Sequence, residues 1–354
     1  MHYDNTRKEP IQGVHSHTLS DGESPNLYEL TNATGMSIVL MDIGATWVSC
    51  LVPVNATKRD VILGCSSAED YAKQTAYFGA TVGRYANRIS KAQFSLDGET
   101  YSLSSNQAGN TLHGGEAGFD KQRWHAESLS HNSVTFSLIS PDGDQGFPGT
   151  LKLSVTYTLN DDNAVTIRYQ GGCDKASPVN LTNHAYFNLS GTDEDCLSHR
   201  LRLNADHYVD VDENLIPTGT LIAVDGDDMD FRVSKVIGRD LMKSPTQRIA
   251  EGYDHAYLLN ADTAEAREVA ASLISPDRKL MMEVFTTKPG LQVYTGNYLA
   301  GEPSRSGEYK KHSGVALETG YLPDSPNQPS FPNSVLAKNA PYNHETTYKF
   351  TIMG

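Results

Sequence analysis

The chain has 354 residues and a formal net charge of −14 at pH 7. Such a surface repels phosphate backbones and anionic membranes, and no run of Lys and Arg offers a local exception, so we expect neither nucleic-acid nor membrane binding. The four cysteines are far apart and form no CxxC pair, which indicates neither a zinc site nor a disulfide framework.

The N-terminal segment, MHYDNTRKEPIQG, is acidic and polar where a signal peptide would need an apolar stretch. No later apolar run is long enough to span a bilayer. We therefore expect a soluble, cytoplasmic protein.

The first clear element is a helix. Helical spacing is scarce in this chain, and the best case is the segment 66–78, SSAEDYAKQTAYF. Ser66 or Ser67 can cap its start, and Glu69 and Asp70 suit the first turn. We expect a short helix here.

Two hairpins follow. Residues 94–96 lead into Asp97-Gly98, a pair that readily adopts the positive φ angles of a tight turn, and 101–103 lead out of it. Residues 151–159, LKLSVTYTL, alternate apolar and polar side chains, as a half-buried strand does. They turn through 160–163 into a second alternating run at 164–169.

Further strand-like runs lie between clusters of Gly, Pro, Asn and Asp throughout the chain. They cover residues 133–139, 199–205, 255–259, 279–287 and 347–353. Continuous antiparallel strands without alternating helices predict an all-β fold, a large antiparallel β-sandwich with few short helices. No repeat or linker divides the chain, so we expect one domain over 1–354, in which the Pro-rich piece 321–332 is an ordered loop.

Five polar places at strand ends and Gly-rich turns are candidates for chemistry. In GRYANRIS (83–90), the guanidinium groups of Arg84 and Arg88 and the amide of Asn87 suit sugar hydroxyls, although a structural ion pair is the better explanation of an arginine taken alone. In NTLHGGEAGFD (110–120), His113 precedes a Gly-Gly pair that permits close backbone approach. The order of a phosphate-binding loop is missing there, and a turn histidine without a function remains an alternative.

The other three places contain His184 (NLTNHAYFNLSG), Asp254 (GYDHAYLL) and Glu318 (GVALETG). Taken alone, His184 is better explained by packing than by a chemical role, and Asp254 is equally well explained by a turn. Glu318 ends an apolar run that is typical of a buried strand, where a carboxylate is costly unless it is paired or used. Desolvation would raise its pKa toward the range of a general base.

Metal and nucleophile chemistry have little support. No two histidines have helical ligand spacing, and the segment containing Asp142 and Asp144 lacks the closing Glu of a calcium loop, so we interpret those aspartates as turn residues. The sequence contains no G-x-S-x-G elbow. We therefore expect neither a metal nor a cofactor.

Seven motifs, taken in order, resemble those of the aldose 1-epimerase (galactose mutarotase) family. They are GRYANRI, LHGG..GFD, DGDQGFPG, TNHAYFNL, YDHA, GLQVYTGN and LPDSPN. The resemblance runs from about residue 41 to the end, and it implies a galactose mutarotase-like supersandwich without a cofactor.

By motif, the resemblance implies that His184 is the general acid and Glu318 the general base. It also implies sugar contacts from Asn87, Arg88, His113, Tyr186, Asp254 and Gln292. One departure is Gly320, where many family members have a Gln, and this change could alter the sugar preference. Trp47, Trp124 or Phe187 could stack on the sugar, although core packing explains each of them better.

These residues predict an isomerase that interconverts the α and β anomers of galactose, glucose and related aldoses in hexose metabolism. Ring opening needs a base for the proton of the C1 hydroxyl and an acid for the ring oxygen, and closure reverses the two roles. The first alternative is a carbohydrate-binding sandwich protein without catalysis. A glycoside hydrolase using Asp254 and Glu318 and an epimerase of phosphorylated hexoses are further alternatives. The preferred aldose and the oligomeric state are left open.

Overall fold

The strands form large antiparallel sheets stacked face to face. The computed structural model describes residues 23–192, 194–263 and 265–354. The N-terminal segment used above to judge a signal peptide lies outside these ranges. Within them, no helix is long and apolar enough to cross a membrane.

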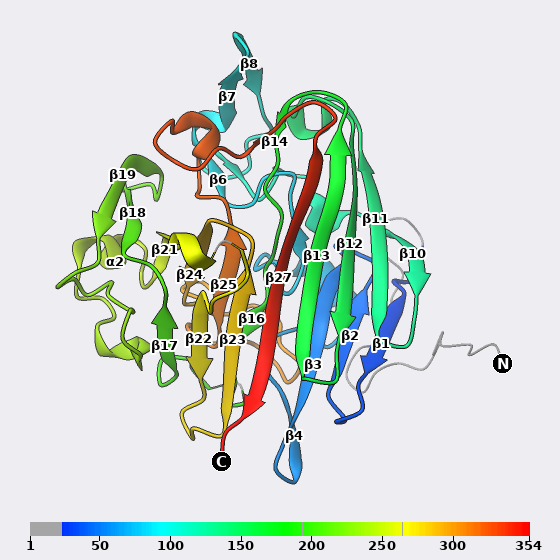
Figure 1. Ribbon diagram of the computed structural model, residues 1–354, viewed down its shortest axis with the longest axis vertical. Helices are drawn as coiled ribbons and strands as arrows, with labels where there is room; N and C mark the ends of the chain where they lie inside the picture. The colour runs from blue at the N-terminus through cyan, green and yellow to red at the C-terminus, as the bar shows by residue number, and fades with distance from the viewer. Residues whose placement is uncertain (1–22, 193, 264) are drawn as a thin grey trace.

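The largest sheet crosses the front of the molecule in Figure 1 and has nine strands. In spatial order these are β10 (His125–Leu129), β11 (Ser133–Ser140), β12 (Leu151–Leu159), β13 (Ala164–Cys173), β27 (Pro341–Ile352), β23 (Leu280–Thr286), β22 (Ala271–Ile274), β17 (Arg200–Leu203) and β20 (Lys235–Val236).

A six-stranded sheet and a four-stranded sheet lie behind it. The first contains β16 (Tyr186–Phe187), β25 (Val315–Gly320), β24 (Gly290–Tyr294), β21 (Asp254–Leu258), β18 (His207–Val211) and β19 (Pro217–Ala223). The second contains β1 (Leu27–Thr31), β2 (Ser37–Met41), β3 (Thr46–Val54) and β4 (Thr57–Asp60).

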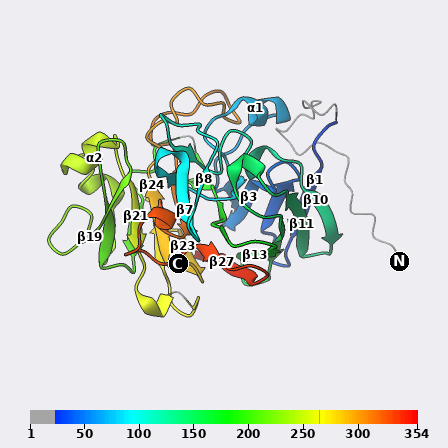
Figure 2. The same ribbon diagram turned by 90° about the horizontal axis from the view of Figure 1, so that it is seen from above.

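Short strand pairs and helices complete the fold. The pairs are β5 (Thr81–Val82) with β15 (Thr182–Asn183), β6 (Arg88–Ile89) with β9 (Thr111–Leu112), β7 (Gln93–Leu96) with β8 (Glu99–Ser102), and β14 (Ser177–Pro178) with β26 (Val335–Leu336). The helices are α1 (Ala68–Lys73) and α2 (Pro245–Ile249), with 3-10 turns at 90–92, 119–121, 144–146, 237–239, 261–263 and 325–327. Seen from above, α1 lies at the back of the molecule, away from the nine-stranded sheet, and α2 lies at its left end (Figure 2).

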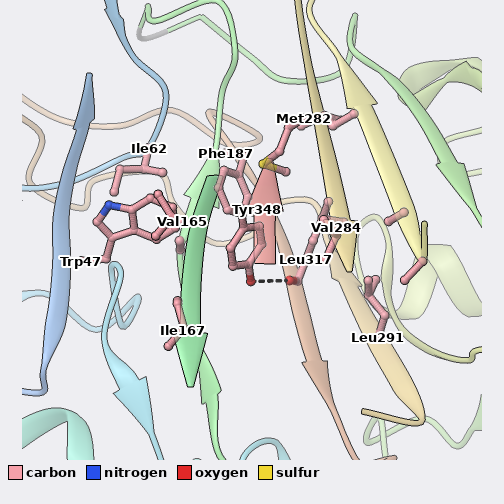
Figure 3. Close-up of a cluster of buried hydrophobic side chains, with 14 of the residues drawn as sticks. Trp47, Ile62, Val165, Ile167, Phe187, Met282, Val284, Leu291, Leu317 and Tyr348 are labelled. Carbon is pink, nitrogen blue, oxygen red and sulfur yellow. Dashed lines mark hydrogen bonds between the residues drawn. The ribbon is translucent and has the colours of Figure 1, made fainter. Parts of the chain in front are cut away.

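The core fills the space between the sheets, as Figure 3 shows. Tyr348 from β27 points toward β25, and its hydroxyl donates a hydrogen bond to the carbonyl of Leu317 at 3.3 Å. Trp47, Trp124 and Phe187 are almost completely buried in this core, so packing rather than sugar stacking is their role.

The predicted elements are largely confirmed. The alternating strands at 151–159 and 164–169 pair as β12 and β13, and the hairpin at 94–103 turns through Asp97 and Gly98 at φ 52° and 84°. Ser67 caps α1 by accepting the N–H of Asp70. This helix ends at Lys73 because Gln74 is already extended, so the last five residues of the predicted segment are not helical.

Candidate active site

Strand alternation separates the core from the site. Leu317 of β25 and Leu291 of β24 face the nine-stranded sheet (Figure 3). Because successive side chains on a strand point to opposite faces, their neighbours Glu318 and Gln292 point to the other face, and these two residues are direct cross-strand partners. The sequence of β25, VALETG, therefore places one carboxylate on the face of the strand that points away from the core. All residues of this strand are buried, and Glu318 is buried with them.

A pocket of about 180 Å³ opens over this face. It brings together seven of the eight predicted residues from segments far apart in the sequence. These are Asn87, Arg88, His113, His184, Tyr186, Asp254 and Glu318. The eighth, Gln292, lies behind the pocket, and its amide donates a 2.6 Å hydrogen bond to Asp254.

His184 and Glu318 form the centre of the pocket. His184 Nε2 lies 3.5 Å from Glu318 Oε1, and both side chains are almost completely buried. Burial, reinforced by the nearby charge of Asp254, raises the pKa of Glu318 to about 8, although Arg88 opposes that shift. Burial lowers the pKa of His184 to about 4. Both shifts favour the neutral form of each group, a protonated Glu318 and an unprotonated His184, because burial disfavours charge.

Aromatic rings hold His184 in place. Its ring lies 5.0 Å from that of Tyr186 and 5.7 Å from that of Tyr77, the latter nearly parallel. The backbone N–H of His184 donates to the carbonyl of Ala80 at 2.9 Å. Tyr77 also contacts the ring of His113, with 4.6 Å between ring centroids. The imidazole therefore has little freedom to turn away from Glu318.

His113 presents an N–H group to the pocket. The backbone N–H of Asn87 donates to His113 Nδ1 at 3.2 Å, so the neutral ring carries its proton on Nε2. Burial and the neighbouring His184 and Arg88 lower the pKa of His113 well below its usual value, which keeps the ring neutral. The next residue, Gly114, has φ 89°, and a Cβ there would lie 1.9 Å from the carbonyl oxygen of Gly83. The expected close backbone approach is thus confirmed.

Arg88 and Asp254 form the charged wall of the pocket. The Arg88 guanidinium lies 3.5 Å from Asp254 Oδ2, and its Nε donates to the amide oxygen of Gln107 at 2.8 Å. The LPDSPN motif supports this wall from outside, since the backbone N–H of Asp324 donates to the carbonyl of Arg88. One face of the pocket therefore offers both a fixed cation and a fixed carboxylate to hydroxyl groups.

The donor set of the pocket favours a polyol over a metal ion. His113, His184 and Glu318 each place one potential ligand atom within 4.8 Å of the others. Metal binding at His113 Nε2 would require the proton to sit on Nδ1, where it would face the N–H of Asn87. The observed hydrogen bond instead leaves His113 as a donor.

Two residues singled out in the sequence lie elsewhere. Arg84 is buried, and its guanidinium donates to the carbonyls of Ser140, Pro148 and Gly149, so its role is structural, through backbone acceptors rather than the expected ion pair. Gly320 lines a second cavity behind Glu318 and not the main pocket.

The sequence reasoning missed several residues that line the pocket. They are Thr75, Ala76, Tyr77, Gln107, Leu112, Tyr294, Tyr298, Leu299 and Glu302. Thr75 donates to the carboxylate of Glu302, which joins two loops at the pocket. Tyr294 belongs to the motif GLQVYTGN, two residues after Gln292, and alternation along β24 could have identified it. Leu112 ends the two-residue strand β9, and the other residues lie outside the named strands and helices.

Comparisons with known proteins agree with this geometry. Residues 26–349 match the family model described as aldose 1-epimerase. The aldose 1-epimerase of Haemophilus influenzae is 49% identical over 335 residues, which cover 93% of this chain and 97% of that protein. The galactose mutarotase of Rattus norvegicus is 44% identical, covering 83% of this chain and 84% of its own. The crystal structure of a GalM/aldose epimerase homologue from C. elegans superposes with a TM-score of 0.87 at 29% identity, covering 93% of this chain and 100% of that one.

Proposed function

This chain belongs to the aldose 1-epimerase family, and we propose that His184 and Glu318 interconvert the anomers of galactose, glucose and related aldoses. Family membership makes the chain an isomerase. The observation that carries the proposed roles is the 3.5 Å approach of His184 Nε2 to Glu318 Oε1 inside one pocket. The opposed pKa shifts of the two groups support the same roles, because they leave one proton to be shared.

Ring opening starts from the form in which Glu318 is a carboxylate and His184 is protonated. Glu318 takes the proton of the C1 hydroxyl while His184 gives its proton to the ring oxygen, so the C1–O5 bond breaks and an aldehyde forms. After rotation about the C1–C2 bond, Glu318 returns a proton to O1 while His184 takes one from the C5 hydroxyl, and the ring closes on the other face. No proton is gained or lost over the cycle.

The sugar itself must help to prepare this form. Without sugar, burial favours the form in which Glu318 carries the shared proton and His184 is neutral. A C1 hydroxyl that donates to Glu318 favours the carboxylate, and the 3.5 Å separation lets the proton pass to His184 after a small adjustment. The proton on Glu318 is also the one needed for ring closure.

The remaining polar groups orient the ring. His113 Nε2 and Arg88 are donors for sugar oxygens, while Asp254 accepts from hydroxyl groups. Gln292 acts through Asp254, whose carboxylate it fixes from behind. Asn87 and Tyr186 line the same pocket and complete the proposed contacts.

Polarimetry on freshly dissolved α-galactose tests this proposal. The wild-type chain should accelerate the optical change, and Glu318→Gln and His184→Asn should each lower kcat by about 10²- to 10⁴-fold. The exposed His125→Asn on β10 is the control and should retain the full rate. If the wild type is no faster than the two pocket variants, the proposal fails, and sugar binding measured without turnover would then identify a binding protein.

We also propose that the chain acts in the cytoplasm. All four cysteines are free and buried. This pattern is typical of a reducing compartment, where thiols do not need to pair.

A further inference from the structure

A second, smaller cavity lies behind Glu318. It measures about 20 Å³, and its lining includes Thr182, Gln292, Glu318 and Gly320. Glu318 and Asn87 line both this cavity and the main pocket, so these two residues lie between them. A single water molecule needs about 10–15 Å³, so the cavity is large enough for one but not for a sugar.

The missing side chain at Gly320 keeps this space open. Gly320 follows Glu318 by two positions on β25, so both residues face the same side of the sheet. A Cβ at position 320 would lie 3.1 Å from Oδ1 and 3.2 Å from Nδ2 of Asn180, whose amide is fixed by hydrogen bonds to the backbone of Tyr321. Any larger residue at this position would crowd the cavity.

Two polar atoms at the cavity have no partner in the described part of the protein. The first is the hydroxyl oxygen of Thr182, and the second is the amide oxygen of Gln292. The orientation of the Gln292 amide is set by its NH₂ group, which donates to Asp254. Buried polar atoms are nearly always hydrogen-bonded, either to protein or to ordered water.

We propose that this cavity binds one water molecule, which accepts a hydrogen bond from the Thr182 hydroxyl and donates one each to Gln292 Oε1 and the Glu318 carboxylate. Three hydrogen bonds are typical of a buried water. Thr182 is then a positioning residue that acts on the general base through the water, which is an extension of the function proposed above.

This water would affect the chemistry because it donates to the charged form of Glu318. Such a hydrogen bond favours the carboxylate over the carboxylic acid. It therefore raises the share of molecules in which Glu318 is ionised and His184 carries the proton, the form that opens the ring. It also orients the carboxylate from the side opposite the sugar.

Thr182→Val separates this proposal from a structural role. Valine matches the shape of threonine but cannot donate to the water. We expect kcat to fall about tenfold with KM unchanged, because Thr182 does not line the sugar pocket. The alkaline limb of the pH–rate profile should move to higher pH, because Glu318 holds its proton more tightly. Thr182→Ser, which keeps the hydroxyl, should restore both quantities.

The matched control is Thr263→Val, a buried threonine whose hydroxyl donates to the carbonyl of Asn260, outside both cavities. Its pH profile should equal that of the wild type. A second probe is Gly320→Ala, which crowds the cavity and should shift the alkaline limb in the same direction as Thr182→Val.

Two results would overturn the proposal. If Thr182→Val keeps the wild-type kcat and pH profile, the Thr182 hydroxyl does not act on Glu318. A buried Thr182 hydroxyl without a hydrogen-bond partner would destabilise the fold, so its removal should then only raise the free energy of unfolding. If kcat falls without a shift of the alkaline limb and serine restores nothing, Thr182 is only structural. Both results require an active wild-type chain, whereas failure of the proposed function would leave the wild type inactive.

Discussion

Replacing Glu318 by glutamine should stabilise the protein at alkaline pH while it removes activity. The buried Glu318 carboxyl keeps its proton up to about pH 8, whereas the ordinary value of about 4.5 applies in the unfolded chain. Between these values the unfolded state releases the proton and the folded state does not. Stability is therefore full below pH 4.5 and is lost as the pH rises toward 8.

The magnitude follows from the two pKa values. Each unit between them costs about 1.4 kcal/mol of stability. The wild type should lose about 1 kcal/mol at pH 5 and about 4 kcal/mol at pH 8 relative to an equivalent protein with no titrating group at this position. Glutamine has nearly the same shape and does not titrate. Glu318→Gln should therefore gain on the order of 3 kcal/mol over the wild type between pH 5 and pH 8.

Urea unfolding of both proteins at pH 5 and pH 8 measures this difference. Glu99→Gln, at an exposed position of the β7–β8 hairpin, serves as the control, and its effect should be the same at both pH values. If Glu318→Gln changes the free energy of unfolding equally at pH 5 and pH 8, burial does not raise the pKa of the Glu318 carboxyl. The argument that this raised pKa suits a general base would then be wrong.

Three further results are expected. The pH–rate profile of the wild type, after subtraction of the uncatalysed reaction, should be bell-shaped with limbs near pH 4 and pH 8. The reason is that the His184–Glu318 pair is proposed to act while it holds one proton. A flat profile would contradict this prediction. Arg88→Gln should raise KM at least about tenfold and move the alkaline limb upward, because the guanidinium is a proposed sugar contact and also lowers the pKa of Glu318. Steady-state polarimetry over a range of pH tests both effects. Tyr348→Phe should lower the free energy of unfolding by about 1 kcal/mol in urea without changing kcat, because its hydroxyl bonds the carbonyl of Leu317 on the core side of β25.

Local patterns in the sequence predict the sandwich well, because the alternation of apolar and polar residues identifies a strand from its own residues alone. Alternation at 151–159 identifies β12 without reference to any other part of the chain, and Asp97-Gly98 identifies its own turn. The order of strands within the nine-stranded sheet has no such local signature. β27, from the end of the chain, lies between β13 and β23, and only packing of the whole core determines that position.

The pocket was predictable to the extent that its residues have unusual local surroundings. A glutamate ending the apolar run of β25 and a histidine followed by two glycines are visible in the sequence. Tyr77 is not, because its place beside His113 and His184 results from a loop with positive φ. The gap left by Gly320 was visible, but its position behind the general base required the register of β25 with β24.

The resting position of the shared proton links the fold to the chemistry. Ring opening starts from the charged forms of a general acid and a general base, but burial disfavours charge on both groups. Both pKa shifts therefore favour the neutral pair, in which the shared proton is on Glu318. For a reaction that runs in both directions this is an advantage, because the neutral pair is the form that closes the ring in the proposed mechanism. In the proposed mechanism only the opening step starts from charge separation, and a hydrogen bond from the sugar's C1 hydroxyl to Glu318 favours that form.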